Sequence, residues 1–209
     1  MSARHVQFGC GLSAPAGWVN YDASPTLRFE RLPLIGRLYT RNGARFPAPV
    51  RYGDIVKGLP ERPGSVDALY SSHVLEHLSL EDLRRALRNA HALLKPGGIF
   101  RSVLPDMEFE ARRYLNDPAE DAVSRFMEVT CFGVRSRPRG LGAITASLFG
   151  NSRHLWMWDY KALAGELADA GFVEIRRAEF GDADLTAYSE VEDLSRWTNC
   201  LGIECRRPR

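Results

Sequence analysis

Short apolar segments, each closed by glycine or polar residues, recur along the chain. Residues 5–8 alternate apolar and polar side chains before the break at Gly9-Cys10-Gly11, and residues 18–22 follow after a short interval. Runs of this length bounded by turn residues are typical of β-strands. Further strands are predicted at residues 50–52, 66–70, 99–104, 172–175 and 198–205.

A helical period replaces this pattern between residues 79 and 94. Ser79 and Asp82 have capping-box spacing, and Gly97 and Gly98 follow as a stop signal. The apolar positions that fall on one face of this helix are Leu83, Ala86, Leu87, Ala90 and Leu94. A second helix is predicted after Asp159 and ends at Gly171. Alternating strands and helices favour an α/β fold with a parallel sheet covered on both faces.

Composition places the chain among ordinary globular proteins. Its 209 residues fit one domain. The content of hydrophobic residues (44%) and of charged residues (26%) is close to the average for soluble globular proteins. The net charge of +2 comes from interspersed charges and gives no general case for a nucleic-acid or membrane partner. No apolar run approaches the roughly 18 residues of a membrane span, and no signal-peptide core follows Met1, which predicts a cytoplasmic protein.

The cysteine and histidine spacing does not indicate a metal site. Four cysteines include no C-x-x-C pair, and the five histidines are scattered. We therefore expect reduced, mostly structural thiols and no bound metal.

The strongest chemical signal is the glycine pair after the first strand, together with Asp22 at the end of the second. Glycines let backbone approach a ligand, and a carboxylate at the next strand end can accept from ribose hydroxyls. Ten residues separate Gly11 from Asp22. A dinucleotide-binding unit needs a full helix there and about 20 positions before its acidic residue. The spacing predicts a nucleoside cofactor without a pyrophosphate and disfavours a nicotinamide-dependent oxidoreductase.

Several blocks in order resemble S-adenosylmethionine-dependent methyltransferases with a Rossmann-like fold, and most closely the small bacterial type 11 domain proteins. The blocks are residues 8–11, 17–22, 72–78 and 94–98, while residues 153–159 and 170–172 resemble the later part of that subgroup. The resemblance implies a single domain over residues 1–209, three layers, and seven strands with the last antiparallel. Residues 23–49 and 107–155 are expected to be lid or substrate-binding insertions.

The resemblance also implies where S-adenosyl-L-methionine and its product, S-adenosyl-L-homocysteine, are held. Asp22 matches the ribose position and Asp54 the position that accepts from the adenine amino group, with Ile55 as an apolar face for the ring. The remaining residues expected at the cofactor, near its amino-acid and methionine portions, are Gly9, Cys10, Gly11, Ser71, Ser72 and His73.

Methyl transfer to a hydroxyl oxygen needs a base, and three residues are candidates: His154, His73 and Asp106. We rank His154 first because it lies in a segment rich in aromatic residues that could shape an acceptor pocket. His77 is interpreted as a packed histidine at a helix start. Trp156 and Trp158 fit a core position as well as an acceptor platform.

The expected acceptor is a small molecule or a glycan intermediate. Enzymes that methylate amino groups of nucleic-acid bases usually carry Asn or Asp, two prolines and an aromatic residue after the fourth strand, whereas Ser71-Ser72-His73-Val74 occurs here. The basic segment with Arg135, Arg137 and Arg139 fits a solvated loop or a contact to an anionic acceptor. A methyltransferase-fold scaffold without turnover remains the alternative, because the first helix is absent and the glycine loop is abbreviated.

Overall fold

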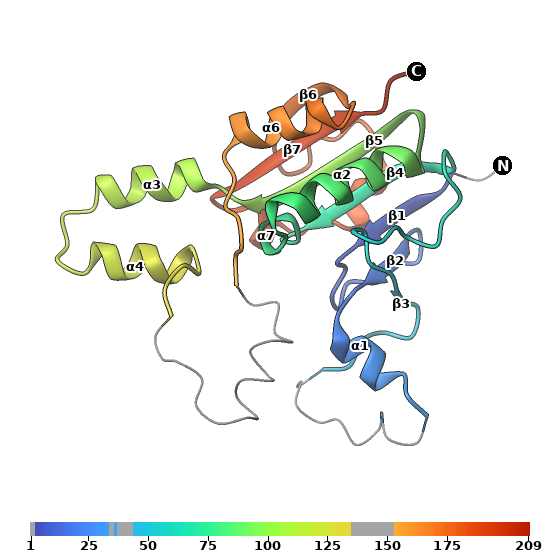
Figure 1. The fold of residues 1–209 in the computed structure, drawn as a ribbon, viewed down its shortest axis with the longest axis horizontal. Coiled ribbons are helices and arrows are strands. Elements are labelled where there is room, and N and C mark those ends of the chain that lie inside the picture. The colour runs from blue at the N-terminus through green and yellow to red at the C-terminus, as the bar shows by residue number, and fades with distance from the viewer. Residues whose placement is uncertain (1–2, 34–35, 37–43, 135–152) are drawn as a thin grey trace.

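A seven-stranded sheet forms the centre of the protein (Figure 1). The computed structural model describes residues 3–33, 36, 44–134 and 153–209. The strands are β1 (His5–Phe8), β2 (Val19–Asp22), β3 (Arg51–Tyr52), β4 (Val66–Ser72), β5 (Leu94–Pro105), β6 (Val173–Ala178) and β7 (Cys200–Arg206). Their order across the sheet is β3-β2-β1-β4-β5-β7-β6.

The strand directions confirm the predicted α/β architecture. The pairs β2–β3, β1–β2, β1–β4 and β4–β5 are parallel. The last strand, β7, runs antiparallel to both β5 and β6. Central strands β4 and β5 are almost continuously buried, as expected when a parallel sheet is covered on both faces.

One face of the sheet is covered by α2 (Leu80–Leu93) and α6 (Tyr160–Asp169). The predicted caps are present: Ser79 Oγ accepts from Asp82 N, and Asp159 Oδ1 accepts from Ala162 N. The buried α2 positions Leu83, Ala86, Leu87 and Ala90 join the main core with Leu163 and Leu167 of α6. The periodic apolar stripes therefore identified the buried faces of both helices.

α2 ends before the two glycines that were predicted to terminate it. Leu94 is already extended and pairs with Val66, so β5 begins without an intervening loop and contains the glycine turn. Gly97 adopts a φ of +77°, which a residue without Cβ accepts at little cost. The register between β4 and β5 shifts at this irregularity.

The opposite face is covered by the segment before β7. No helix is present among residues 9–18, all of which the structure describes. Instead η3 (Thr186–Glu190) and α7 (Leu194–Trp197) supply Tyr188 and Trp197, which pack in a second core with Trp18. Tyr188 is fully buried and its hydroxyl donates to a main-chain carbonyl, with Leu69 O and Ile99 O each 3.1 Å away.

A buried arginine fixes this segment to the sheet. Arg101 of β5 has no exposed side-chain surface and contacts three carboxylates, those of Glu192 (2.6 Å), Glu204 (3.0 Å) and Asp182 (2.8 Å). Its guanidinium carbon lies 4.7 Å from the centre of the Trp197 ring. Multiple hydrogen-bonded partners offset the cost of removing these charges from water.

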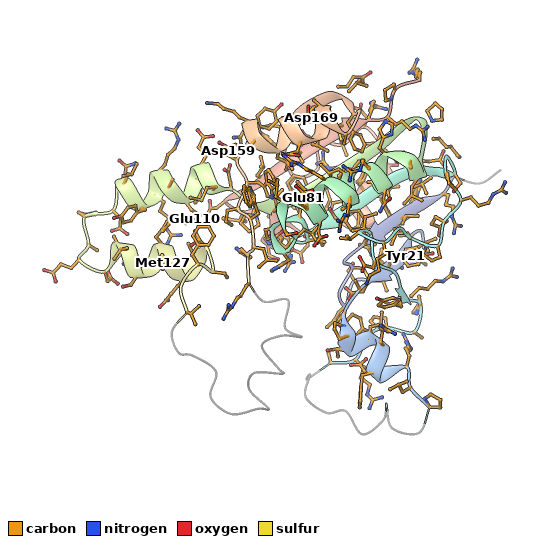
Figure 2. The ribbon with its side chains drawn as sticks, in the orientation of Figure 1. Tyr21, Glu81, Glu110, Met127, Asp159 and Asp169 are labelled. Carbon is orange, nitrogen blue, oxygen red and sulfur yellow. The ribbon has the colours of Figure 1, made fainter. Side chains whose placement is uncertain are left out.

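Two segments extend from the sheet. α1 (Pro25–Glu30) follows β2, while α3 (Met107–Leu115) follows β5 and is joined by α4 (Ala122–Val129). In Figure 2, Glu110 on α3 and Met127 on α4 lie well apart from Tyr21 on β2. Among the described helices, none combines the length and apolar character needed to cross a bilayer.

Replacing Arg101 with alanine is expected to lower the free energy of unfolding by about 3–5 kcal/mol, because Glu192 would remain buried without its ion-pair partner and Glu204 would retain only Arg176. Urea unfolding followed by circular dichroism measures the loss. The matched control is Arg84→Ala, which removes a half-exposed pair with Glu166 and should cost about 1 kcal/mol or less. Equal losses in the two variants would contradict a structural role for the buried network.

Candidate cofactor site

The polar residues singled out in the sequence follow parallel strands and therefore converge on one edge of the sheet. Gly9 and Gly11 follow β1, Asp22 ends β2, and His73 follows β4. Parallel strands bring their carboxyl ends to the same edge, where α/β proteins bind ligands. Both glycines have positive φ, +63° and +54°, so the chain turns sharply there.

Asp22 holds the glycine loop in place. Its Oδ2 accepts from Gly11 N at 2.9 Å, and its Oδ1 accepts from Ser24 N at 2.7 Å. A further bond from Cys10 N to Tyr21 O, at 3.0 Å, links the loop to β2. A carboxylate oxygen has more than one acceptor position, so these contacts leave capacity for ribose hydroxyls.

The Cys10 side chain lies beneath the loop. It packs with Leu27 and Val50 in a small apolar cluster. Burial, together with the charge of Asp22, raises the pKa of the Cys10 thiol to about 12. A thiol with that pKa is neutral at physiological pH, so Cys10 offers a ligand its backbone rather than a reactive sulfur.

Asp54 and Ile55 follow β3 at the far side of the glycine loop. Asp54 Oδ1 accepts from Val56 N at 3.0 Å, and Oδ2 lies 2.9 Å from Lys57 Nζ. The Ile55 side chain is 5% exposed and packs in the main core. The prediction that Ile55 covers the adenine ring gains no support from this placement, whereas Asp54 remains partly exposed.

Ser71 and Ser72 occupy different environments at the end of β4. Ser71 is buried, and its Oγ lies 2.9 Å from Ser102 Oγ. Ser72 Oγ accepts from Arg196 Nε at 3.4 Å. Ser72 is therefore the more accessible of the two to a ligand at the sheet edge.

His73 has both ring nitrogens engaged. Nε2 lies 2.9 Å from Arg196 O, and Nδ1 lies 3.4 Å from Glu76 Oε1. Burial lowers the pKa of this imidazole, but contacts with Cys200, Glu76 and Arg196 outweigh burial and raise it to about 9. Its φ of +54° is uncommon for a residue with a Cβ, so the backbone turns sharply here.

Asp106 is a capping residue in the structure. Oδ1 accepts from Glu108 N at 2.9 Å at the start of α3, and Oδ2 lies 3.2 Å from Arg177 Nη1. The carboxylate is therefore already occupied by a helix N-terminus and a guanidinium.

His154 lies beside the segment that follows β4. Leu155 N donates to Glu76 O at 2.7 Å, and the His154 and His77 rings are 5.1 Å apart. Nδ1 of His154 is buried without a hydrogen-bond partner among the described residues, and burial lowers its pKa. The neighbouring tryptophans separate: Trp158 is 2% exposed in the core, whereas Trp156 is 44% exposed.

Two residues near His73 carried no sequence signal strong enough to select them. Glu76 was visible only as part of a motif, and its complete burial is a tertiary property. Arg196 lies more than a hundred positions away in sequence and reaches Ser72 and His73 through α7. The predicted basic positions Arg135, Arg137 and Arg139 lie outside the described residues.

Comparison with known families supplies the decisive match. Residues 6–102 match the family described as a methyltransferase domain. This part of the chain carries the glycine loop, Asp22, Asp54 and the segment after β4. This match to a methyltransferase domain covers 97 of the 209 residues, just under half of the chain. The match confirms the predicted resemblance to methyltransferases over this part of the chain. No curated protein matches the chain significantly.

Solved structures agree on the fold of the methyltransferase domain. A Haloferax volcanii methyltransferase in complex with the Trm112 activator has a TM-score of 0.52 at 18% identity, covering 99% of this chain and 83% of that one. A Thermotoga maritima protein described as a possible histamine N-methyltransferase has a TM-score of 0.52 at 19% identity, and the match covers 99% of this chain and 83% of that one. Haemonchus contortus phosphoethanolamine N-methyltransferase 2 has a TM-score of 0.50 at 11% identity, and the match covers 100% of this chain and 49% of that one. At identities this low, the structural likeness shows a common fold alone.

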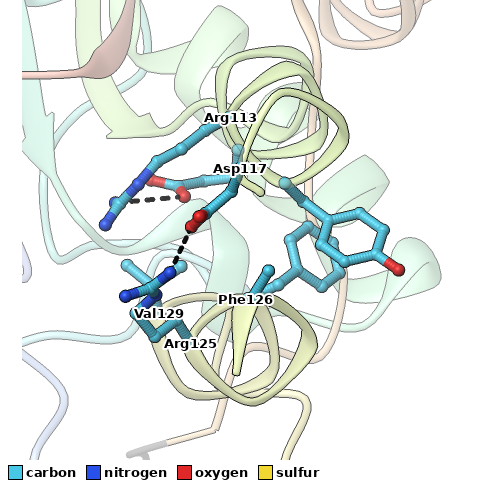
Figure 3. A pocket seen from close by; sticks show the side chains of 8 residues that line it. Arg113, Asp117, Arg125, Phe126 and Val129 are labelled. Carbon is cyan, nitrogen blue, oxygen red and sulfur yellow. Dashed lines mark hydrogen bonds and ion pairs between the residues drawn. The ribbon is translucent and has the colours of Figure 1, made fainter. Parts of the chain in front are cut away.

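Two cavities lined by described residues lie away from the proposed cofactor edge. One lies between α3 and α4, where Arg113, Asp117 and Arg125 surround a volume of about 10 Å³ (Figure 3). That volume is enough for about one water molecule and excludes a substrate. The other, about 270 Å³, lies at the opposite end of the sheet, where Asp67, Lys95 and Ile99 lie near the amino ends of β4 and β5.

Substituting alanine at the two loop glycines should separate backbone strain from steric conflict. Both positions have positive φ, which costs an alanine roughly 1–2 kcal/mol. A Cβ at Gly9 would also collide with the Val74 side chain, whereas a Cβ at Gly11 meets open space. We expect Gly9→Ala to lose about 1–3 kcal/mol more than Gly11→Ala in urea unfolding. Equal losses would show that Val74 does not restrict the loop.

Proposed function

We propose that the protein transfers the methyl group of S-adenosylmethionine to a hydroxyl oxygen of a small molecule or glycan intermediate. The observation that carries the cofactor part is the contact between Asp22 and the glycine loop within the methyltransferase domain. In this arrangement a carboxylate and the glycine-loop backbone lie at the edge where α/β folds bind ligands.

The proposed cofactor contacts follow from these positions. Asp22 accepts from the ribose hydroxyls, and Asp54 accepts from the adenine amino group. Backbone at Gly9, Cys10 and Gly11 adjoins the amino-acid end, while Ser72 and His73 adjoin the methionine portion. Ser71 and Ile55 contribute mainly by supporting this edge, because both side chains are buried.

His154 is the proposed base that removes the proton of the acceptor hydroxyl. Methyl transfer from a sulfonium needs an oriented acceptor and, for a hydroxyl, removal of its proton. Asp106 is engaged by a helix start and Arg177, and both nitrogens of His73 face acceptor atoms. His154 retains an unpartnered ring nitrogen within the described part of the chain, which supports its rank as first candidate.

Residues 23–49 and 107–155 are proposed to cover the acceptor. Their described parts leave the sheet at the carboxyl ends of β2 and β5, beside the proposed cofactor site. Trp156, exposed and 6.0 Å from the Trp158 ring centre, would add an apolar surface. The acceptors named for the solved neighbours differ from one another, so the shared fold leaves acceptor chemistry to these segments.

S-adenosylmethionine or S-adenosylhomocysteine should raise the melting temperature of the wild-type protein. At 100 times its dissociation constant a ligand adds about 2.7 kcal/mol of stability, or roughly 5–10 °C for a chain of this size. Asp22→Asn should weaken binding by roughly 10–100-fold, because charge-assisted bonds to the ribose are lost. Differential scanning fluorimetry and calorimetric titration provide the measurements.

The matched control for Asp22→Asn is Asp67→Asn, whose carboxylate pairs with Lys95 at the other end of the sheet. It should leave the ligand-induced shift unchanged, and NAD should produce none in any variant. Absence of a shift with S-adenosylmethionine and its product would overturn the cofactor assignment. Binding without turnover across an acceptor panel would instead support the scaffold alternative.

His154→Gln should lower turnover by roughly 10²–10⁴-fold on any hydroxyl acceptor found in a panel of sugars and phenols. Product S-adenosylhomocysteine is measured in the presence of a chelator, so that metal effects are excluded. His91→Gln, the same substitution on α2 away from this edge, is the control. Full turnover by the His154 variant would eliminate this residue as the base.

A further inference from the structure

Three side chains with metal-ligating atoms converge beside the proposed cofactor site. Glu76 and His77 belong to η2 (Leu75–His77), and His154 reaches them from 77 positions further along the chain than His77. One ligand atom from each lies within 4.8 Å of the others. Glu76 Oε1 is 3.9 Å from His77 Nε2. The spacing of residues in the sequence could not predict this cluster, because two segments that are distant in the chain form it.

The carboxyl group at the centre of this cluster is buried beside the His73 imidazole and receives no hydrogen bond from the described residues. Glu76 is 0% exposed, and neither of its oxygens has a hydrogen-bond partner in the described part of the chain. A nearby imidazole nitrogen, His73 Nδ1, lies 3.4 Å from Oε1. A buried carboxylate is normally paired, hydrogen-bonded or bound to a metal.

The two histidines are oriented as metal ligands usually are. His77 Nδ1 lies 2.9 Å from Arg153 O, which leaves Nε2 directed toward Glu76. His154 has Nδ1 buried without a described partner, and the Thr130 backbone contacts its ring. Ligating histidines characteristically use the second ring nitrogen in a bond to a carbonyl, which fixes the tautomer and the ring orientation.

We propose that Glu76, His77 and His154 form a binding site for a divalent first-row transition metal ion, represented by Zn²⁺. Two imidazoles and a carboxylate are a common three-residue set for such ions and leave a further position for water or another ligand. In a tetrahedral site with ligand bonds of about 2.1 Å, the donor atoms lie about 3.4 Å apart. The donor atoms of this cluster, which lie within 4.8 Å of one another, would therefore have to move together by roughly 1 Å when an ion binds.

The backbone already holds the two halves of the site together. Glu76 O accepts from Leu155 N at 2.7 Å and from Trp156 N at 3.2 Å. His154 is thus held next to η2 before any ion binds. His77 is 22% exposed at its side chain, which gives an ion access from solvent. Bound metal would cross-link the returning segment to the end of β4.

This site is independent of cofactor binding but shares an atom with the proposed base. Nδ1 of His154 cannot ligate a metal and accept a proton in the same molecule. The metal experiment therefore contains neither cofactor nor acceptor, and the turnover experiment contains a chelator. A negative result in the metal-binding experiment therefore does not affect the turnover experiment, and the converse also holds.

Co²⁺ and Zn²⁺ are titrated into full-length protein that has been dialysed against a chelator. The proposal expects a single tight equivalent of Co²⁺ with visible d–d bands, displacement by Zn²⁺, and a metal-induced rise in melting temperature. His77→Gln and His154→Gln should weaken binding by at least roughly tenfold. Both residues are partly exposed, so these variants are expected to fold; Glu76→Gln is added as an isosteric test of the buried ligand.

His91→Gln is the matched control and should bind Co²⁺ as the wild-type protein does, because His91 lies outside the cluster. Each variant is compared with its own metal-free melting temperature. Failure of the wild-type protein to bind a single equivalent would overturn the proposal. So would undiminished binding by the cluster variants, or a thiolate-to-cobalt charge-transfer band, which would place the ion at a cysteine such as Cys200 beside His73.

Discussion

Parallel pairing of β2, β1, β4 and β5 is the constraint on which the site depends. It brings the ends of four strands to one edge, where Asp22 bonds to Gly11 and His73 begins the segment that contains Glu76. A parallel connection normally requires a crossover of a dozen or more residues. The short interval between β1 and β2 satisfies it with a turn, which leaves one face of the sheet without its usual first helix.

The structure covers that face from the other end of the chain. Tyr188 and Trp197 fill the space over β4 and β5, and Arg101 binds three carboxylates from the covering segment and β7. α7 also carries Arg196, whose carbonyl and side chain contact His73 and Ser72. The same segment that replaces the missing helix therefore helps to set the end of β4, where the methionine portion of the cofactor is proposed to bind.

The region between the proposed cofactor and acceptor is unusually rich in imidazoles. His73, His77 and His154 surround the fully buried Glu76, each in a different hydrogen-bond setting. His73 is tied to α7, whereas His154 arrives with the segment that follows α4. The end of β4, α7 and the segment that contains His154 thus meet around one carboxyl group, which makes their relative placement sensitive to what that carboxyl group binds.

Sequence alone determined the strands, the α2 and α6 stripes, their caps and the methyltransferase resemblance, because these depend on local periodicity and on residues close together in the chain. The gap between Gly11 and Asp22 likewise excluded a pyrophosphate-binding helix. Tertiary structure decided which side chains point where. It placed Ile55 and Trp158 in the core, engaged Asp106 with Arg177, and joined His154 to Glu76. Those outcomes depend on packing between distant segments, which local pattern and spacing do not encode.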